Sequence, residues 1–75
     1  MEEVIILTFA STHRALGAEK IFAVRRIPFV TIPVPRRISA GCGLALQFAA
    51  AEEAAVQRVI KDENIIFEGI HYLKK

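Results

Sequence analysis

Hydrophobic positions along the chain are spaced in a way that predicts four strands. Residues 4–9 form a β-branched and aromatic run with apolar side chains on both faces, which is typical of a central strand covered on both sides. Residues 29–33 predict a strand at the edge of a sheet, because Pro33 has no N–H to donate to a neighbour. Larger apolar residues alternate with Ala45 and Gln47 over 44–48, and residues 65–73 predict the last strand.

Two segments rich in alanine and charged residues predict helices. The first runs from Thr12 to about Arg25, with Ser11 or Thr12 placed to cap its first turn. The second runs from about Ala51 to Asp62 and is ended by Asn64. The faces expected to pack inward carry Ala15, Leu16, Ala18, Phe22 and Ala23 in the first helix and Val56, Val59 and Ile60 in the second.

The order of these elements predicts the fold class. Strand, helix, strand, strand, helix and strand within 75 residues indicate an α+β protein with a ferredoxin-like βαββαβ sandwich. We expect a single domain over residues 1–75, with a four-stranded antiparallel sheet in the strand order 4-1-3-2 and two helices on one face. There is no room for a second core.

This topology predicts which loops lie together. The first and second strands run parallel, so the junction at 9–12 and the long loop at 34–43 should emerge at the same end of the sheet. The turn at 62–64 should leave from that end as well. We therefore expect Ser11, Thr12 and His13 to be neighbours of Cys42.

Composition limits the classes of protein to which this chain can belong. A hydrophobic content of 53% with 24% charged residues excludes intrinsic disorder, and a formal charge of +2 is too small to indicate nucleic-acid binding without a localised patch. One cysteine cannot form an intramolecular disulfide, which favours a reduced, cytoplasmic compartment. The apolar run near the N-terminus is too short for a signal peptide or a membrane span. Because so small a domain usually needs added stability, we expect a homodimer, formed through the bare sheet face with contributions from residues 4–9 and the last strand.

The loop at 34–43 holds the sharpest candidate for chemistry. Cys42 stands between Gly41 and Gly43, whose missing side chains leave the thiol uncrowded. A reactive cysteine must be largely thiolate at neutral pH, and cations or a helix N-terminus favour that form. Arg36 in the same loop, the helix start at Ser11 and Thr12, and His13 can supply this stabilisation. The alternative is that Cys42 is a small buried apolar residue and that His13 and Arg36 are solvated surface groups.

Other polar residues give weaker signals. Glu19 falls within the apolar stripe of the first helix, so we expect its carboxylate to reach an edge or an arginine such as Arg26. His13, His71 and one cysteine are a poor zinc set. We expect neither a metal nor a cofactor.

Two blocks of sequence resemble a known family. They are STHRALGAEK at 11–20 and PVPRRISAGCGLAL at 33–46, and the segment EGI at 68–70 fits as well. Together they resemble the small bacterial and archaeal selenium/sulfur carrier protein-like family. The resemblance implies that Cys42 is the carrier thiol, that Arg36 is the basic loop residue, and that Ser11, Thr12 and His13 are the residues of the helix start.

The leading hypothesis is a sulfur or selenium carrier. Cys42 would accept a persulfide or selenosulfide from a donor protein and pass it to an acceptor protein, so the chain would be a carrier rather than an enzyme with its own turnover. The alternative is a non-catalytic ferredoxin-like module that dimerises or binds a partner and in which Cys42 is incidental. A thiol-redox enzyme is disfavoured because the chain has no resolving cysteine. Nucleic acid is disfavoured because the open sheet face is aliphatic, and no membrane partner is expected.

Overall fold

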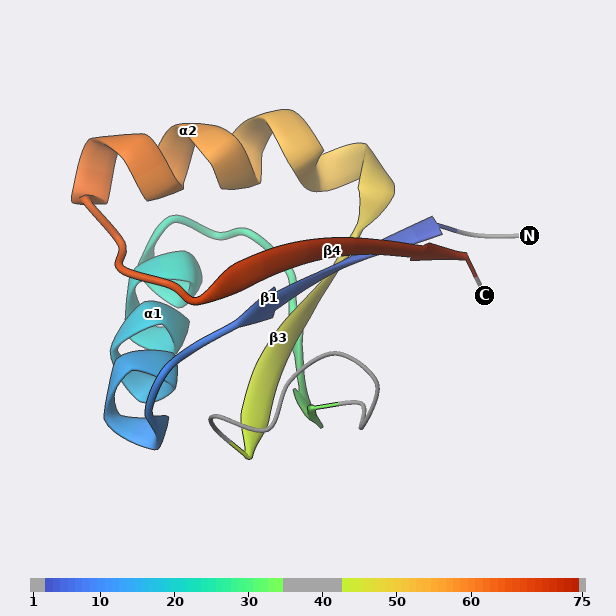
Figure 1. The fold of residues 1–75 in the computed structure, drawn as a ribbon. Coiled ribbons are helices and arrows are strands. Elements are labelled where there is room, and N and C mark those ends of the chain that lie inside the picture. Colours follow the sequence, from blue (N-terminus) through green and yellow to red (C-terminus); the bar gives the residue numbers. More distant parts are fainter. Residues whose placement is uncertain (1–2, 35–42, 75) are drawn as a thin grey trace.

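The chain folds into one antiparallel sheet with two helices against it, as a computed structural model shows for residues 3–34 and 43–74 (Figure 1). The elements are β1 (Glu3–Thr8), α1 (Thr12–Val24), β2 (Val30–Pro33), β3 (Leu44–Ala49), a short 3-10 helix η1 (Ala50–Glu52), α2 (Glu53–Glu63) and β4 (Gly69–Lys74). The strand order is β2-β3-β1-β4, with every neighbouring pair antiparallel. The predicted α+β ferredoxin-like fold and its strand order are confirmed.

β1 occupies the centre of the sheet and is buried on both faces. Ile5, Leu7 and the following Phe9 belong to the main core beneath the helices. Val4 and Ile6 point to the other face, where they form a second apolar cluster with Ala45. A central strand whose two faces are both covered needs no polar alternation, which explains the continuous apolar run in the sequence.

The main core joins both helices to the same side of the sheet. Ala15, Ala18 and Phe22 of α1 and Val56 and Val59 of α2 are all buried in it. The Phe22 ring meets the Phe48 ring of β3 edge to face, with 4.8 Å between ring centroids.

The buried stripe of α1 is narrower than the sequence predicted. Leu16 is 45% exposed and Ala23 is exposed, so assigning them to the inward face was wrong. The buried residues are Ala15, Ala18 and Phe22, which follow the spacing of one helix face. Leu16 and Ala23 each lie one position further along, about 100° around the helix, and so turn away from the sheet.

The chain between α2 and β4 differs from the prediction. Asn64 ends α2 in the left-handed conformation, with φ 52°, as expected of a residue that stops a helix. Residues 65–68 are not a strand, so the prediction of a strand from 65 to 73 was wrong at its beginning. Ile65 and Phe67 pack on the main core, and the Glu68 N–H donates to the Thr8 carbonyl over 2.7 Å, leading the chain into β4.

Two further predictions concern single residues. Of the two alternatives predicted for Glu19, the structure shows the edge and not Arg26: the Glu19 Oε2 accepts a hydrogen bond from the Thr31 hydroxyl of the edge strand β2 over 2.6 Å. β2 is an edge strand, as the missing N–H of Pro33 predicted. Within the described ranges 3–34 and 43–74, neither helix has the length and apolar character to cross a bilayer.

Candidate functional site

The first turn of α1 is fixed by its cap. Ser11 has an extended backbone, and its hydroxyl oxygen accepts a hydrogen bond from the Arg14 N–H over 3.3 Å. The Ser11 carbonyl accepts from the Ala15 N–H over 3.1 Å. Ser11 therefore acts as the N-cap, one of the two caps that the sequence predicted.

The register of the sheet places the start of β3 and the start of α1 at the same end of the sheet, where β1 finishes. β1 ends at Thr8, which pairs with Ala45 near the beginning of β3. The Val34 N–H donates to the Gly43 carbonyl over 3.3 Å, so both ends of the long loop are joined at this edge. Gly43, which precedes β3, and Ser11, which precedes α1, therefore lie at the same end of the sheet.

The structure describes four of the predicted site residues. Ser11, Thr12 and His13 are exposed in the first turn of α1, and Gly43 is exposed, where an added β-carbon would meet no described residue within 4 Å beyond its chain neighbours. The remaining three, Arg36, Gly41 and Cys42, lie outside the described residues. The exposure of Cys42 and its distance from His13 therefore stay predictions.

The start of α1 has a positive electrostatic character. Its first turn holds no acidic residue, and it carries Arg14 and His13. The amides at a helix N-terminus add a partial positive charge directed along the axis. The combination favours an anion, and a thiolate or a persulfide is an anion of this kind.

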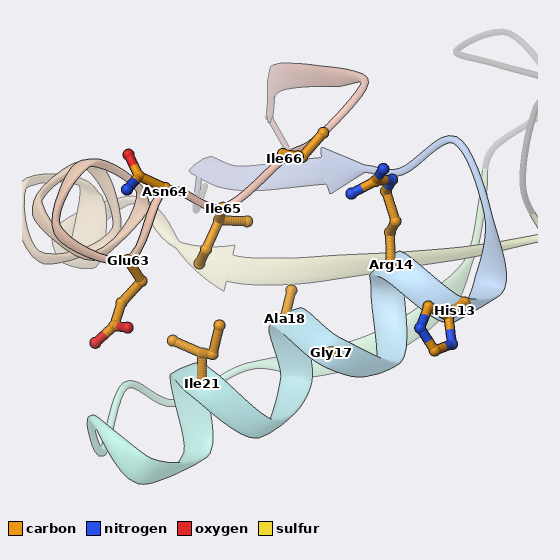
Figure 2. A pocket seen from close by; sticks show the side chains of 9 residues that line it. All are labelled: His13, Arg14, Gly17, Ala18, Ile21, Glu63, Asn64, Ile65 and Ile66. Carbon is orange, nitrogen blue, oxygen red and sulfur yellow. The ribbon is translucent and has the colours of Figure 1, made fainter.

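A groove runs beside this turn, between α1 and the connection from α2 to β4 (Figure 2). It has a volume of about 250 Å³ and is lined by His13, Arg14, Gly17, Ala18, Ile21, Glu63, Asn64, Ile65 and Ile66. Figure 2 shows Ala18 and Ile21 opposite Ile65, with Glu63 at one end of the groove and Arg14 and His13 at the other.

Most of this groove could not be predicted from the sequence. His13, Arg14 and Gly17 lie off the sheet-facing side of α1, and residues 63–66 line the other wall of the groove beside them. The available signal was Gly17, a poor helix former placed near the middle of a helix. The other wall could not be found, because residues 65–68 carry an apolar pattern that fits a strand equally well.

His71 lies in a different part of the molecule. It pairs with Ile6 across β1 and β4, and a β-carbon on Gly69 would lie 3.0 Å from its Nε2. Within residues 3–34 and 43–74 no cluster of three or more histidine, cysteine or acidic residues could hold a metal ion.

A comparison with known families identifies the family of this chain. A family model described as "Putative Se/S carrier protein-like" matches residues 4–72. The chain belongs to this family. The match extends from β1 into β4 and includes Cys42, the loop before it and the start of α1. No curated protein matches the chain, and neither does any solved structure.

Proposed function

We propose that the protein carries sulfur or selenium on Cys42. Its family is described by this role, and the family match includes the cysteine. The observation that carries the proposal is the position of two segments at one end of the sheet. They are Gly43, which follows Cys42 in the sequence, and the capped start of α1, which carries Arg14. We expect the partial positive charge of the helix start to favour the thiolate form of Cys42.

The loading step is a transfer between two sulfur atoms. The Cys42 thiolate attacks the outer sulfur of a donor persulfide, and a new S–S bond forms as the donor's own S–S bond breaks. The donor leaves as a thiolate. The proton on the outer sulfur stays on that sulfur, which is now bonded to Cys42. No oxidant is needed, because one disulfide-type bond replaces another.

Unloading repeats the same exchange in the other direction. An acceptor thiolate attacks the outer sulfur, and Cys42 leaves as the thiolate that it was before loading. A low pKa of the Cys42 thiol favours both its attack at neutral pH and its departure. The α1 amides, Arg14 and Arg36 are the groups that we expect to lower that pKa. For selenium, a selenosulfide replaces the persulfide.

The competing account is a partner-binding or dimerising module in which Cys42 is incidental. It predicts that the folded chain loads sulfur no faster than any accessible thiol does. The short peptide Ala-Gly-Cys-Gly-Leu, which copies residues 40–44 without the fold, is the matched control.

The experiment measures intact mass after incubation with a cysteine desulfurase and L-cysteine. The carrier account expects a gain of one sulfur atom, reversed by a reducing thiol, no gain in Cys42→Ser, and faster loading of the chain than of the control peptide. Equal rates for the chain and the peptide, or the same gain in Cys42→Ser, would refute the proposal. Repeating the assay with L-selenocysteine tests whether selenium reaches the same thiol.

A further inference from the structure

The groove beside α1 is longer than the part next to His13. A second hollow of about 250 Å³ is lined by Lys20, Ile21, Val24, Arg25 and Glu63. Because the two hollows share Ile21 and Glu63, they lie next to each other, and together they follow α1 from His13 to Val24. At 1.5 Å per helical residue this is a length of about 17 Å, which matches about five residues of extended chain.

Gly17 keeps the floor of this groove open. Glycine is a poor helix former, yet Gly17 lies within α1. Among the described residues, a β-carbon there would meet no atom within 4 Å beyond its chain neighbours and the nearby backbone of α1. Packing of the described residues therefore does not require a glycine. The effect of the missing side chain is to leave space between α1 and Ile65.

Apolar side chains on both walls are left in contact with water. Val24 is 80% exposed and Ile66 is 60% exposed, and both line the groove. Ile21 and Ile65 beneath them are only partly buried. Exposed apolar residues gathered along a groove are typical of a surface that binds another chain.

The charges along the groove are mainly positive. Arg14 and Lys20 lie on the α1 side, and neither side chain has an ion-pair partner within residues 3–34 and 43–74. Glu63 is already neutralised, since its Oε2 lies 3.1 Å from Arg25 Nε. An occupant that complements this surface is acidic.

We propose that the groove binds an extended, acidic segment of a partner protein. About five residues lie along α1, an apolar side chain packs over Gly17 and Ala18, and carboxylates pair with Arg14 and Lys20. That the partner is a sulfur donor or acceptor rests on the proposed function. The bound segment would then hold the partner near the end of the sheet where Gly43 and the start of α1 lie.

The test is an NMR titration of the isotope-labelled full chain carrying Cys42→Ser, so that its result does not depend on sulfur transfer. The probe is the peptide acetyl-Asp-Leu-Asp-Leu-Asp-amide, and the same peptide with asparagine in place of aspartate is its control. We expect the acidic peptide to shift the signals of Gly17, Ala18, Ile21 and Ile65, with weaker binding as salt is raised.

Variants locate the binding surface. Gly17→Leu fills the groove without a clash at its β-carbon and should abolish the shifts while the rest of the spectrum stays folded. Arg14→Ala should weaken binding about three- to fivefold, as expected for one exposed ion pair. Arg58→Ala removes an exposed cation of α2 that does not line the groove and should change nothing.

The proposal would be overturned by the absence of shifts with the acidic peptide, by equal shifts with the asparagine peptide, or by unchanged binding in Gly17→Leu. Groove signals that move with protein concentration alone would show a second copy as the occupant and would overturn it as well. Each of these results leaves the sulfur-loading experiment unaffected, so the two proposals fail separately.

Discussion

Gly17 and Gly69 differ in what surrounds their α-carbons. A β-carbon on Gly17 would point into open space, whereas one on Gly69 would lie 3.0 Å from His71 Nε2 and 3.3 Å from the Thr8 hydroxyl oxygen. Packing between β1 and β4 explains why position 69 is a glycine. No such packing explains Gly17, which is why we connect Gly17 with binding in the groove.

Gly17→Ala should stabilise the protein. Replacing a mid-helix glycine with alanine contributes about 1 kcal/mol to helix stability, and no described neighbour opposes the new methyl group. A gain of that size raises the Tm of a domain this small by roughly 4–8 °C, which thermal unfolding can measure. Gly69→Ala is the control and should give no such gain. A lower Tm for Gly17→Ala would show that the glycine has a structural role.

The ionisation of Cys42 tests the residue-level part of the carrier account. We expect its thiol to have a pKa below the usual value of roughly 8.5, because the start of α1 and Arg36 favour the thiolate. Arg36→Ala should raise that pKa by up to about one unit, and His13→Ala should change it less, since a neutral imidazole contributes little charge. The pH dependence of iodoacetamide labelling gives these values.

Two controls accompany the labelling. Cys42→Ser gives the background, and Arg58→Ala removes an exposed charge of α2 instead of one beside the loop. A pKa at or above the usual value that ignores Arg36 would favour the module in which Cys42 is incidental.

At the level of elements, the sequence predicted what depends on local pattern and topology. The order of elements gave the sheet order, Ser11 gave the cap of α1, and Pro33 gave the edge strand. It failed for residues 65–68, because an apolar run indicates burial and does not distinguish a strand from an irregular segment packed on the core. The same failure concealed one wall of the groove.

A contact between β4 and α2 predicts a pH dependence of stability. The Tyr72 hydroxyl donates to Glu53 Oε2 over 2.8 Å. This hydrogen bond, followed by partial desolvation and the negative charge of Glu53, raises the pKa of Tyr72 above its usual value of 10.0. The folded state therefore keeps the phenol proton more tightly than the unfolded chain does.

The sign follows from that preference. Below pH 10.0 the Tyr72 phenol is protonated in both the folded and the unfolded chain, and the hydrogen bond contributes fully to stability. Above pH 10.0 the unfolded chain loses the phenol proton first. Stability therefore falls as the pH rises, until the pKa of Tyr72 in the folded chain is passed. Urea unfolding on both sides of pH 10.0 should show a steeper loss for the wild type than for Tyr72→Phe. Parallel losses in the two proteins would contradict the assigned contact.

On the scale of the whole molecule, the sequence predicted the topology of the sheet but not the shape of the groove. Parallel β1 and β2 brought the long loop and the start of α1 to one edge, as topology alone requires. The groove depends on how residues 63–66 lie along α1, which no local pattern encodes.

A homodimer through the bare sheet face stays a prediction, and the structure changes which residues can contribute. Val4 and Ile6 are only 5% and 1% exposed in the single chain, so they can add little contact area. Val30, which is 56% exposed, and the partly buried Ile32 and Leu73 remain on that face. Sedimentation equilibrium at micromolar concentration should give twice the 8.3 kDa chain mass, and Val30→Asp should lower it. A single-chain mass for the wild type would contradict the dimer.

Discharge of loaded sulfur tests the central claim most directly, because a carrier must release what it accepts. The chain is loaded with the desulfurase, separated from it, and mixed with an acceptor protein thiol while the intact masses of both are followed. The account predicts that the chain loses one sulfur atom as the acceptor gains one, leaving Cys42 free to load again. A loaded chain that keeps its sulfur, or an acceptor that gains sulfur equally from Cys42→Ser taken through the same procedure, would contradict it.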